Sequence, residues 1–451
     1  MKLILSFFNE PAFIAGMMAL IGLIALKKPI SKIVNGTLKT IIGFVIFSSG
    51  ATVICNALNV IGPAFQDAFH MQGVVPTNEA FIGIIQKNFG TEMALIMAFG
   101  FLVNLLIARL TSLKYVFLTG HHILFMSGLI AAVLSVAGFK GVELIIVGSL
   151  LQGATMVITP AVVQPYYRKV TGGDTVAMGH YNALTYVIAA EISKLTGDKS
   201  RSTEDVKVPE SLSFFRDNVI STSIVMFIIT LICMLAADSK TVAKLAGTEN
   251  IFIFSVMTAL TFSAGFVIVL QGVRMMLAEI VPAFKGIAEK IVPDAIPALD
   301  CPVIFPFAPN AVIIGFLASL AGALVTFAIL PFTGLPIIIP GLIPAFFVGA
   351  AAGVLANAQG GLRGTIIGCF VNGLILNFLP ALLLPLLGSL GFANTTFGDA
   401  DFVFNGIVIG NLAKSFSKAG VYGLLVVILA IFVGVTVRAK GKAAAKQTKA
   451  V

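Results

Sequence analysis

Long apolar runs recur along the whole chain of 451 residues, and they limit its possible folds more than any other feature. A run of about 20 apolar residues can cross the core of a bilayer as a helix. Only 11% of the residues are charged, against about 25% in a soluble domain. We therefore predict an all-α polytopic membrane protein with about 11 transmembrane helices. The predicted spans lie near residues 11–26, 38–57, 93–108, 116–138, 143–163, 217–237, 250–281, 311–331, 334–358, 364–388 and 419–437.

The positive charges predict the orientation of the chain. Lys27, Lys28 and Lys32 follow the first span, so we expect that loop in the cytoplasm and the N-terminus outside. The region 194–216 and the basic tail, residues 438–451, fall on the cytoplasmic side by the same count. The net charge of +9 comes largely from these loops and the tail. It therefore indicates a lipid bilayer as partner and argues against a nucleic acid.

Two weakly apolar stretches, residues 175–192 and 400–413, do not fit as full spans. Each is predicted to be a re-entrant hairpin. The alternative for both is an amphipathic helix at the membrane surface, and the sequence leaves the two open.

A faint internal repeat divides the chain into two halves. Ile61–Phe65 reads Ile-Gly-Pro-Ala-Phe, and Ile280–Phe284 reads Ile-Val-Pro-Ala-Phe, about 220 residues later. Gly120 has a counterpart in Gly341 at nearly the same separation. An odd number of spans in each half inverts the second copy relative to the first, which is a transporter architecture. We predict one membrane domain over residues 1–451, with repeats at 11–195 and 217–413, a last transmembrane helix at 419–437 and a cytoplasmic tail at 438–451.

Asp300 stands in a proline-broken stretch between Pro293 and Asn310, with apolar segments on both sides. Such backbone is tolerated at membrane depth only where protein or a water-filled space satisfies its amides. A carboxylate at that depth is usually functional. The stretch ends in Phe307-Ala-Pro-Asn310, which suits a helix start whose free amides are open to a ligand. We therefore predict that Asp300 binds the substrate of a transporter.

Two Gly-His pairs supply further polar groups. Gly120-His121-His122 opens an apolar segment, and Gly179-His180-Tyr181-Asn182 lies on the stretch 175–192. With only four histidines in the chain, we expect His121 and His180 to lie close together and to bind a ligand by hydrogen bonds. The alternative for His121 and His122 is that they cap a helix at the membrane interface. The alternative for His180 is a histidine in a loop without a binding role. Arg274 is predicted to brace the fold rather than contact substrate.

No enzyme motif is recognisable, and neither a P-loop nor a Ser/His/Asp arrangement is present. The four cysteines show no CxxC spacing, so the sequence predicts neither a zinc site nor a disulfide framework. No catalytic residue, metal or cofactor is therefore expected.

The chain resembles the ascorbate-type membrane subunit, EIIC, of the bacterial sugar phosphotransferase system. The segments that carry the resemblance are Asn35–Phe44, Leu118–His121, Gly179-His180, Gln271–Arg274, Asp300-Cys301, Phe307–Val312 and Ile339–Pro344. The resemblance implies a homodimer in the bacterial plasma membrane, with a mobile part that carries the sugar in an elevator manner. It also implies cytoplasmic partners: EIIB, which phosphorylates the sugar from a phosphocysteine, and EIIA. EIIC itself uses no cofactor.

The resemblance further implies a set of substrate-binding residues. Positions that match in kind are Ser48, Ser49, Gly50, His121, His180 and Asp300. Other positions depart, because Phe125 and Tyr181 stand where ascorbate carriers show Gln, and Asn78-Glu79 stand where they show Thr-Tyr. The resemblance favours ascorbate as the substrate, while a related sugar acid, another sugar and a neutral polyol stay open. The alternative from another class is an ion-coupled secondary transporter in which Asp300 and the histidines carry protons.

Overall fold

The structure is a computed structural model of the chain. It describes residues 11–68, 73–74, 76, 78–206, 218–388 and 396–448. The helices are α2 (Pro11–Ala25), α3 (Ile30–Ala68), α4 (Asn78–Leu110), α5 (Gly120–Val136), α6 (Gly141–Thr171), α7 (Ala183–Thr196), α8 (Asn218–Ala236), α9 (Ser239–Ala246), α10 (Ile251–Ile291), α11 (Pro309–Ile329), α12 (Leu342–Gly388) and α13 (Ala400–Thr448). Short 3-10 helices are η1 (Thr203–Asp205), η3 (Cys301–Phe307) and η4 (Leu330–Phe332).

Several of these helices can cross a membrane. Within the described residues, five helical stretches are long and apolar enough, and a sixth results if α9 and the start of α10 form one broken span. The five are Asn88–Leu110, Gly141–Thr171, Pro309–Phe332, Pro344–Gly388 and Ala400–Gly441. The predicted helical membrane protein is therefore confirmed, whereas the count of about 11 spans stays a prediction.

Two long helices contain a break where the sequence predicted a boundary. In α12 the backbone leaves helical geometry at Gly360 and Gly361, between the predicted spans 334–358 and 364–388. Gly361 has φ 61°, and a Cβ there would lie 2.3 Å from the carbonyl oxygens of Asp198 and Arg201. Only glycine fits this turn. In α13 the break falls at Ser417, which separates the stretch 400–413 from the last predicted span.

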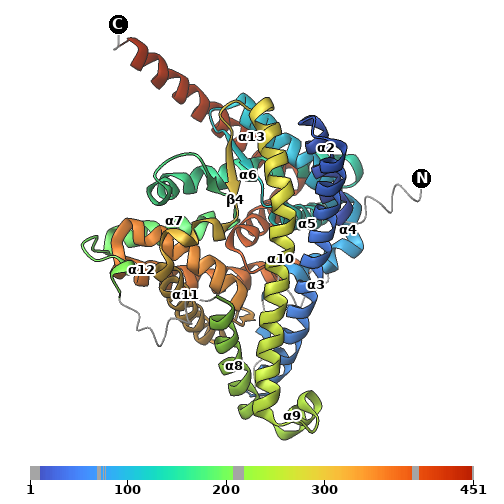
Figure 1. The fold of residues 1–451 in the computed structure, drawn as a ribbon, viewed down its shortest axis with the longest axis vertical. Helices are drawn as coiled ribbons and strands as arrows, with labels where there is room; N and C mark the ends of the chain where they lie inside the picture. Colours follow the sequence, from blue (N-terminus) through green and yellow to red (C-terminus); the bar gives the residue numbers. More distant parts are fainter. Residues whose placement is uncertain are drawn as a thin grey trace.

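Within the described residues, five short β-strands add to the predicted all-α architecture. They are β1 (Gly73–Val74), β2 (Tyr115–Phe117), β3 (Ala177–Met178), β4 (Ile296–Leu299) and β5 (Ile337–Ile338). Strands β2, β4 and β3 form one parallel sheet in that order, and β1 pairs with β5 in a second, also parallel. In Figure 1, β4 lies near the middle of the molecule, and the long helices α3 and α10 pack against each other.

Strand β4 holds the larger sheet together from its centre. Val116 is opposite Pro297, and Ala298 is opposite both Phe117 and Ala177. The Leu118 amide donates to the Ala298 carbonyl at 2.9 Å, and the Gly179 amide donates to the Leu299 carbonyl at 2.6 Å. Pro297 cannot donate, and its nitrogen faces the side on which β3 has not yet begun, so the ladder loses no hydrogen bond.

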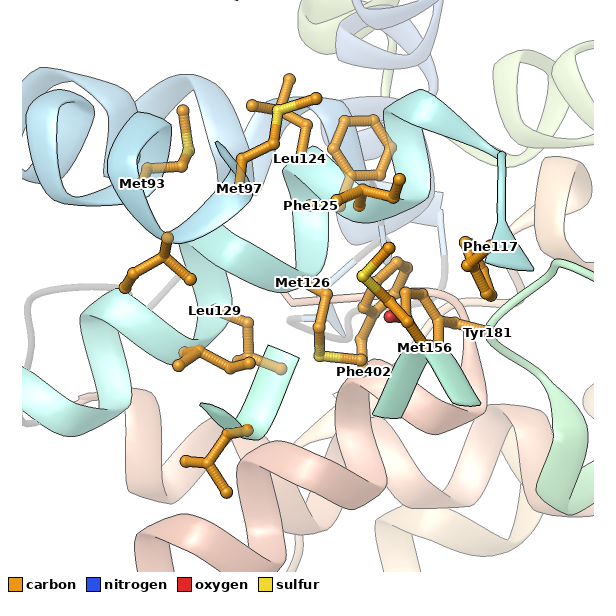
Figure 2. Packing of buried hydrophobic residues seen from close by; sticks show 14 of the residues in the cluster. Met93, Met97, Phe117, Leu124, Phe125, Met126, Leu129, Met156, Tyr181 and Phe402 are labelled. Atoms are coloured by element: carbon orange, nitrogen blue, oxygen red, sulfur yellow. The ribbon is translucent and has the colours of Figure 1, made fainter. Parts of the chain in front are cut away.

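The buried apolar side chains that the structure describes form two large clusters. The first gathers mainly from α4, α5, α6 and the start of α13, and Figure 2 shows part of it. The second gathers mainly from α7, α11 and α12. Small residues bring α11 and α12 into close contact, since a Cβ on Gly315 would lie 2.3 Å from the Gly349 carbonyl oxygen. In a bilayer the hydrophobic effect does not drive helices together, because the lipid is as apolar as their side chains. Helices there associate by close packing at small residues of this kind.

Candidate functional site

The three parallel strands bring three distant polar residues to one edge of the sheet. Asp300 directly follows β4, His180 comes two residues after β3, and His121 follows β2 at the start of α5. Because the strands are parallel, their carboxyl ends meet at the same edge. Both predicted histidines contact Asp300, which confirms that they lie close together.

Asp300 is the centre of this group. Its Oδ1 is 3.1 Å from His180 Nδ1 and also accepts the backbone N–H of Cys301 at 2.8 Å. Its Oδ2 is 3.7 Å from His121 Nε2. The Cys301 hydrogen bond makes Asp300 the N-cap of η3, which fixes the carboxylate in place. The Asp300 and His121 side chains are only 13% and 12% exposed, so these polar groups are largely removed from solvent.

The N-termini of α7 and α13 meet beside this group and cap each other. The Asp401 carboxylate accepts the backbone N–H groups of Ala183 at 2.7 Å and Leu184 at 3.0 Å, at the start of α7. In return, the Asn182 side-chain oxygen accepts the N–H of Ala400 at 2.6 Å, at the start of α13. A carboxylate at a helix N-terminus is also favoured by the helix dipole. This reciprocal capping holds the two helix starts together at the sheet edge.

Asp399 brings a second carboxylate to the histidines. Its Oδ1 accepts the Asn182 side-chain amide at 2.5 Å and lies 3.6 Å from His180 Nε2. The Asn78 side chain also donates to Asp399, and it accepts the Gly398 N–H at 2.9 Å. His180 therefore stands between two carboxylates, Asp300 on its Nδ1 side and Asp399 on its Nε2 side.

Aromatic rings pack behind the histidines. The ring centroid of His122 is 4.1 Å from that of His180, and His122 Nδ1 accepts the Tyr181 N–H at 3.2 Å. Tyr181 stacks on Phe117 at 4.8 Å, and its hydroxyl is 3.3 Å from that of Thr155. Figure 2 shows Phe117, Phe125, Tyr181 and Phe402 within the first apolar cluster.

Two buried polar atoms at this site have no hydrogen-bond partner within the described residues: His180 Nε2 and the Tyr186 hydroxyl. The Tyr186 ring lies 6.0 Å from that of His180. Unpaired buried polar atoms are rare in native proteins because each costs about 1–3 kcal/mol. Their grouping here marks a place where a polar ligand would supply the missing partners.

A comparison with known families decides what kind of protein this is. A family model described as EIIC-GAT, the PTS system sugar-specific permease component, matches residues 6–401. The chain belongs to this family. An "Ascorbate-specific PTS system EIIC component" of Mycoplasma pneumoniae is 27% identical over 418 residues, covering 80% of this chain. The chain spans 63% of that relative, less than two thirds of its length.

The resemblance to EIIC found in the sequence is thereby confirmed, and the apolar helices make this EIIC-family protein a multi-pass membrane protein. The other residues predicted from the sequence do not all lie at the sheet edge. Asn78 joins the network through Asp399 and Gly398. Ser49 is exposed and donates to the Val45 carbonyl of its own helix at 2.9 Å. The side chains of Ser48, Glu79 and Arg274 lie outside the described residues, so their predicted roles stay predictions.

Phe125 and Tyr181 pack inside this EIIC-family protein, against other aromatic rings. Phe125 is 3% exposed and Tyr181 is 0% exposed. Phe125 lies against His121, with ring centroids 5.8 Å apart. Their predicted contact with substrate stays a prediction. In the structure Phe125 packs against His121, and Tyr181 packs against His122.

The start of α11 departs from the sequence expectation. Its amides were expected to face a ligand, but the N–H groups of Asn310 and Ala311 donate to the Glu204 carboxylate at 3.2 and 3.0 Å. The Asn310 side chain donates to the carbonyls of Thr203 and Val206. The loop after α7 therefore occupies this helix end, and the expectation was wrong.

Sequence reasoning missed Asp399 and Asp401 as site residues. A signal was present, since Gly398-Asp399-Ala400-Asp401 opens the stretch 400–413 that was predicted to be re-entrant. Acidic residues at a helix start suggest caps, but nothing in the sequence shows that one caps a different helix. Possible metal ligands also gather here in two sets that share Asp300, one with His121 and His122 and one with His180 and Cys301.

Proposed function

We propose that this protein is the EIIC permease of a phosphotransferase system and binds its sugar at the carboxyl edge of the β2–β4–β3 sheet. The observation that carries the proposal is the convergence of His121, His180 and Asp300 at that edge, with Asp399 beside them. Cytoplasmic EIIB, charged by EIIA, phosphorylates the carried sugar from its phosphocysteine. The histidines bind the sugar and take no part in phosphoryl transfer.

The chemistry of the group suits a ligand rich in hydroxyls. The carboxylates of Asp300 and Asp399 accept hydrogen bonds from sugar hydroxyls, and charge-assisted bonds of this kind are the strong ones. His180 Nε2 and the Tyr186 hydroxyl, which make no hydrogen bond within the described residues, offer further hydrogen bonds, although Asp399 lies 3.6 Å from His180 Nε2. Aromatic rings behind them supply a rigid apolar support of the kind found in small-molecule sites.

The charge of the group favours a neutral sugar or polyol over an acid. Within the described residues, the ion-pair partners of Asp300 and Asp399 are histidines, and no lysine or arginine reaches either carboxylate. An anion placed beside them would be repelled with little counter-charge to offset its lost hydration. The relative named for ascorbate supports the second candidate, ascorbate or a related sugar acid.

The wider arrangement supports the proposed transport architecture. Strands β1 and β2 fall in the first predicted repeat and β4 and β5 in the second, and the pairs β1–β5 and β2–β4 each join the two repeats. By position in the repeats, β1 corresponds to β4 and β2 corresponds to β5. Exchanging the two repeats therefore turns the β1–β5 pair into the β4–β2 pair, as an internal two-fold axis requires. We propose that this unit moves as an elevator within a homodimer of the bacterial plasma membrane. The proposed orientation has the N-terminus outside and the tail inside.

The test is a binding screen on the purified protein followed by uptake assays. Calorimetry against a panel of neutral sugars, polyols, sugar acids and ascorbate is expected to give one ligand class at micromolar to millimolar affinity. Uptake of that ligand into vesicles is expected to require EIIB and a phosphate donor. Uptake that needs only a proton or sodium gradient would contradict the proposal and favour the ion-coupled transporter.

A further inference from the structure

We propose that His180, Asp300 and Cys301 bind a divalent cation of the zinc class at the end of strand β4. The three residues offer a ring nitrogen, a carboxylate oxygen and a thiol sulfur, and these donor atoms lie within 4.8 Å of one another. The set comes from two segments that the sheet holds in register, since the Gly179 amide donates to the Leu299 carbonyl. No short sequence motif contains it, which is why cysteine spacing could not reveal it.

The spacing is close to that of a metal site. A tetrahedral zinc ion keeps N, O and S ligands at about 2.0–2.3 Å, so neighbouring donor atoms lie about 3.3–3.8 Å apart. His180 Nδ1 and Asp300 Oδ1 are 3.1 Å apart. The widest gap in the set is at most 4.8 Å, so a contraction of about 1 Å is enough to bring all three donors onto one ion.

The donor types select the kind of metal. A thiolate with an imidazole suits zinc and its softer relatives, whereas magnesium and calcium prefer oxygen ligands alone. Cys301 is 1% exposed and would bind as a thiolate, with its proton released to the solvent. Three protein ligands leave a fourth position for water or another donor.

The surroundings of His180 match those of a metal ligand. A ligating histidine commonly points its second nitrogen at a carboxylate, which fixes the ring and makes the ligating nitrogen more basic. His180 Nε2 faces Asp399 Oδ1 at 3.6 Å while Nδ1 faces Asp300. On the other side, Asp300 Oδ2 faces His121 Nε2 at 3.7 Å, so a second imidazole contacts the carboxylate that the site would use.

A cation at this point would compete with the sugar, because Asp300 and His180 serve both. This part of the inference rests on the proposed function, whereas the metal site itself does not. Cation and sugar are therefore measured separately.

The metal site is tested on the full-length protein purified without a histidine tag. Calorimetry with zinc chloride is expected to show one tight site per chain, and Co²⁺ or Cd²⁺ is expected to give the absorption of sulfur-to-metal charge transfer. Cys301→Ser is expected to abolish that absorption and to weaken zinc binding by about tenfold or more. Failure of the wild-type protein to bind zinc, or charge transfer that persists in Cys301→Ser, overturns the proposal.

Cys369→Ser is the matched control. Cys369 is 0% exposed, and its sulfur lies 3.9 Å from the Gly349 carbonyl oxygen, within the helical packing of α12. This variant is expected to keep both the absorption and the zinc affinity, and loss of either would place the metal elsewhere. If Cys301→Ser does not fold, His180→Gln serves instead, and unchanged zinc affinity in that variant contradicts the site.

Competition is measured last, with the sugar found in the binding screen. The sugar is expected to lower the apparent zinc affinity in proportion to its own occupancy. If zinc affinity is the same with and without bound sugar, the metal site is still supported, but the proposal that sugar and cation share Asp300 and His180 is refuted. Zinc binding by a protein that binds no sugar at all refutes the proposed function alone.

Discussion

The two small parallel sheets are built alike and end very differently. Both join a strand of the first predicted repeat to one of the second. The β2–β4–β3 sheet ends in His121, His180 and Asp300, whereas β5 ends among apolar side chains of the small cluster around Leu330, Ile338 and Ala381. The Ile338 carbonyl is already paired with the Asn377 amide at 2.9 Å.

The difference shows that the strand pairing alone does not make a site. The larger sheet has a third strand, β3, which adds His180 and sets the start of α7 against Asp399 and Asp401. The smaller sheet ends at apolar side chains, and Asn377 already occupies its Ile338 carbonyl. The comparison is consistent with the proposed ligand site on the β3 side, and we propose a bracing role for the β1–β5 pair.

The largest expected effect comes from pushing β3 off β4. A Cβ on Gly179 would lie 2.4 Å from the Ala298 carbonyl oxygen, a backbone atom that cannot turn away. Gly179→Ala is expected to cost about 1–3 kcal/mol of stability and to abolish sugar binding, measured by thermal unfolding and calorimetry. The control is Gly73→Ala in β1, where the closest atom is Ile339 Cγ1 at 2.9 Å, a side-chain atom, and the nearest backbone oxygen is 3.3 Å away. Equal losses of sugar binding in the two variants would refute the comparison.

Asp300→Asn comes next. The substitution keeps the shape but removes the charge that His121 and His180 contact, at distances of 3.7 and 3.1 Å. A hydrogen bond to a charged group is worth about 1.5–3 kcal/mol, so sugar affinity is expected to fall by about tenfold or more while the protein still folds. Calorimetry measures the affinity, and an unchanged value would remove Asp300 from the site.

His121 separates hydrogen bonding from phosphoryl transfer. His121→Gln keeps hydrogen-bonding capacity, so part of the uptake is expected to remain. His121→Ala is expected to lose more, because partner groups left unpaired cost about 1–3 kcal/mol. The readouts are uptake and sugar phosphorylation with EIIB present. If both variants lose phosphorylation equally while binding sugar normally, the histidine takes part in the chemistry.

The smallest effect is expected at the reciprocal caps. Asp401→Ala removes the acceptor for the Ala183 and Leu184 amides at the start of α7. Loss of an N-cap costs about 0.5–2 kcal/mol, so a modest drop in thermal stability and a weaker loss of sugar affinity than in Asp300→Asn are expected. A loss of affinity larger than that of Asp300→Asn would make Asp401 a direct contact.

The sequence predicted the membrane class, the boundaries at which α12 and α13 break, and the closeness of His121 and His180. These rest on local signals: apolar length, proline and glycine breaks, and polar groups at membrane depth. Asp300, His121 and His180 are polar residues in or beside apolar segments, so the local sequence is enough to single them out.

The rest depends on contacts between distant segments. A strand of two residues such as β3 has no periodicity to recognise, and its pairing with β4 joins residues about 120 apart in the chain. Asp401 looks like a cap for its own helix, yet it caps α7. Glu204 closes the start of α11 from a loop that precedes it by about a hundred residues. These contacts follow from the packing of the whole fold.

Hydrogen exchange of the sugar-bound protein tests the central claim most directly, because it reads both sheets at once. Saturating sugar is predicted to slow exchange in peptides that cover residues 118–122, 179–184 and 299–301, and to leave the peptide 337–341 unchanged. Protection confined to 337–341, or no change at the β2–β4–β3 edge in protein that calorimetry shows to be sugar-bound, would contradict the assignment of the sugar to that edge.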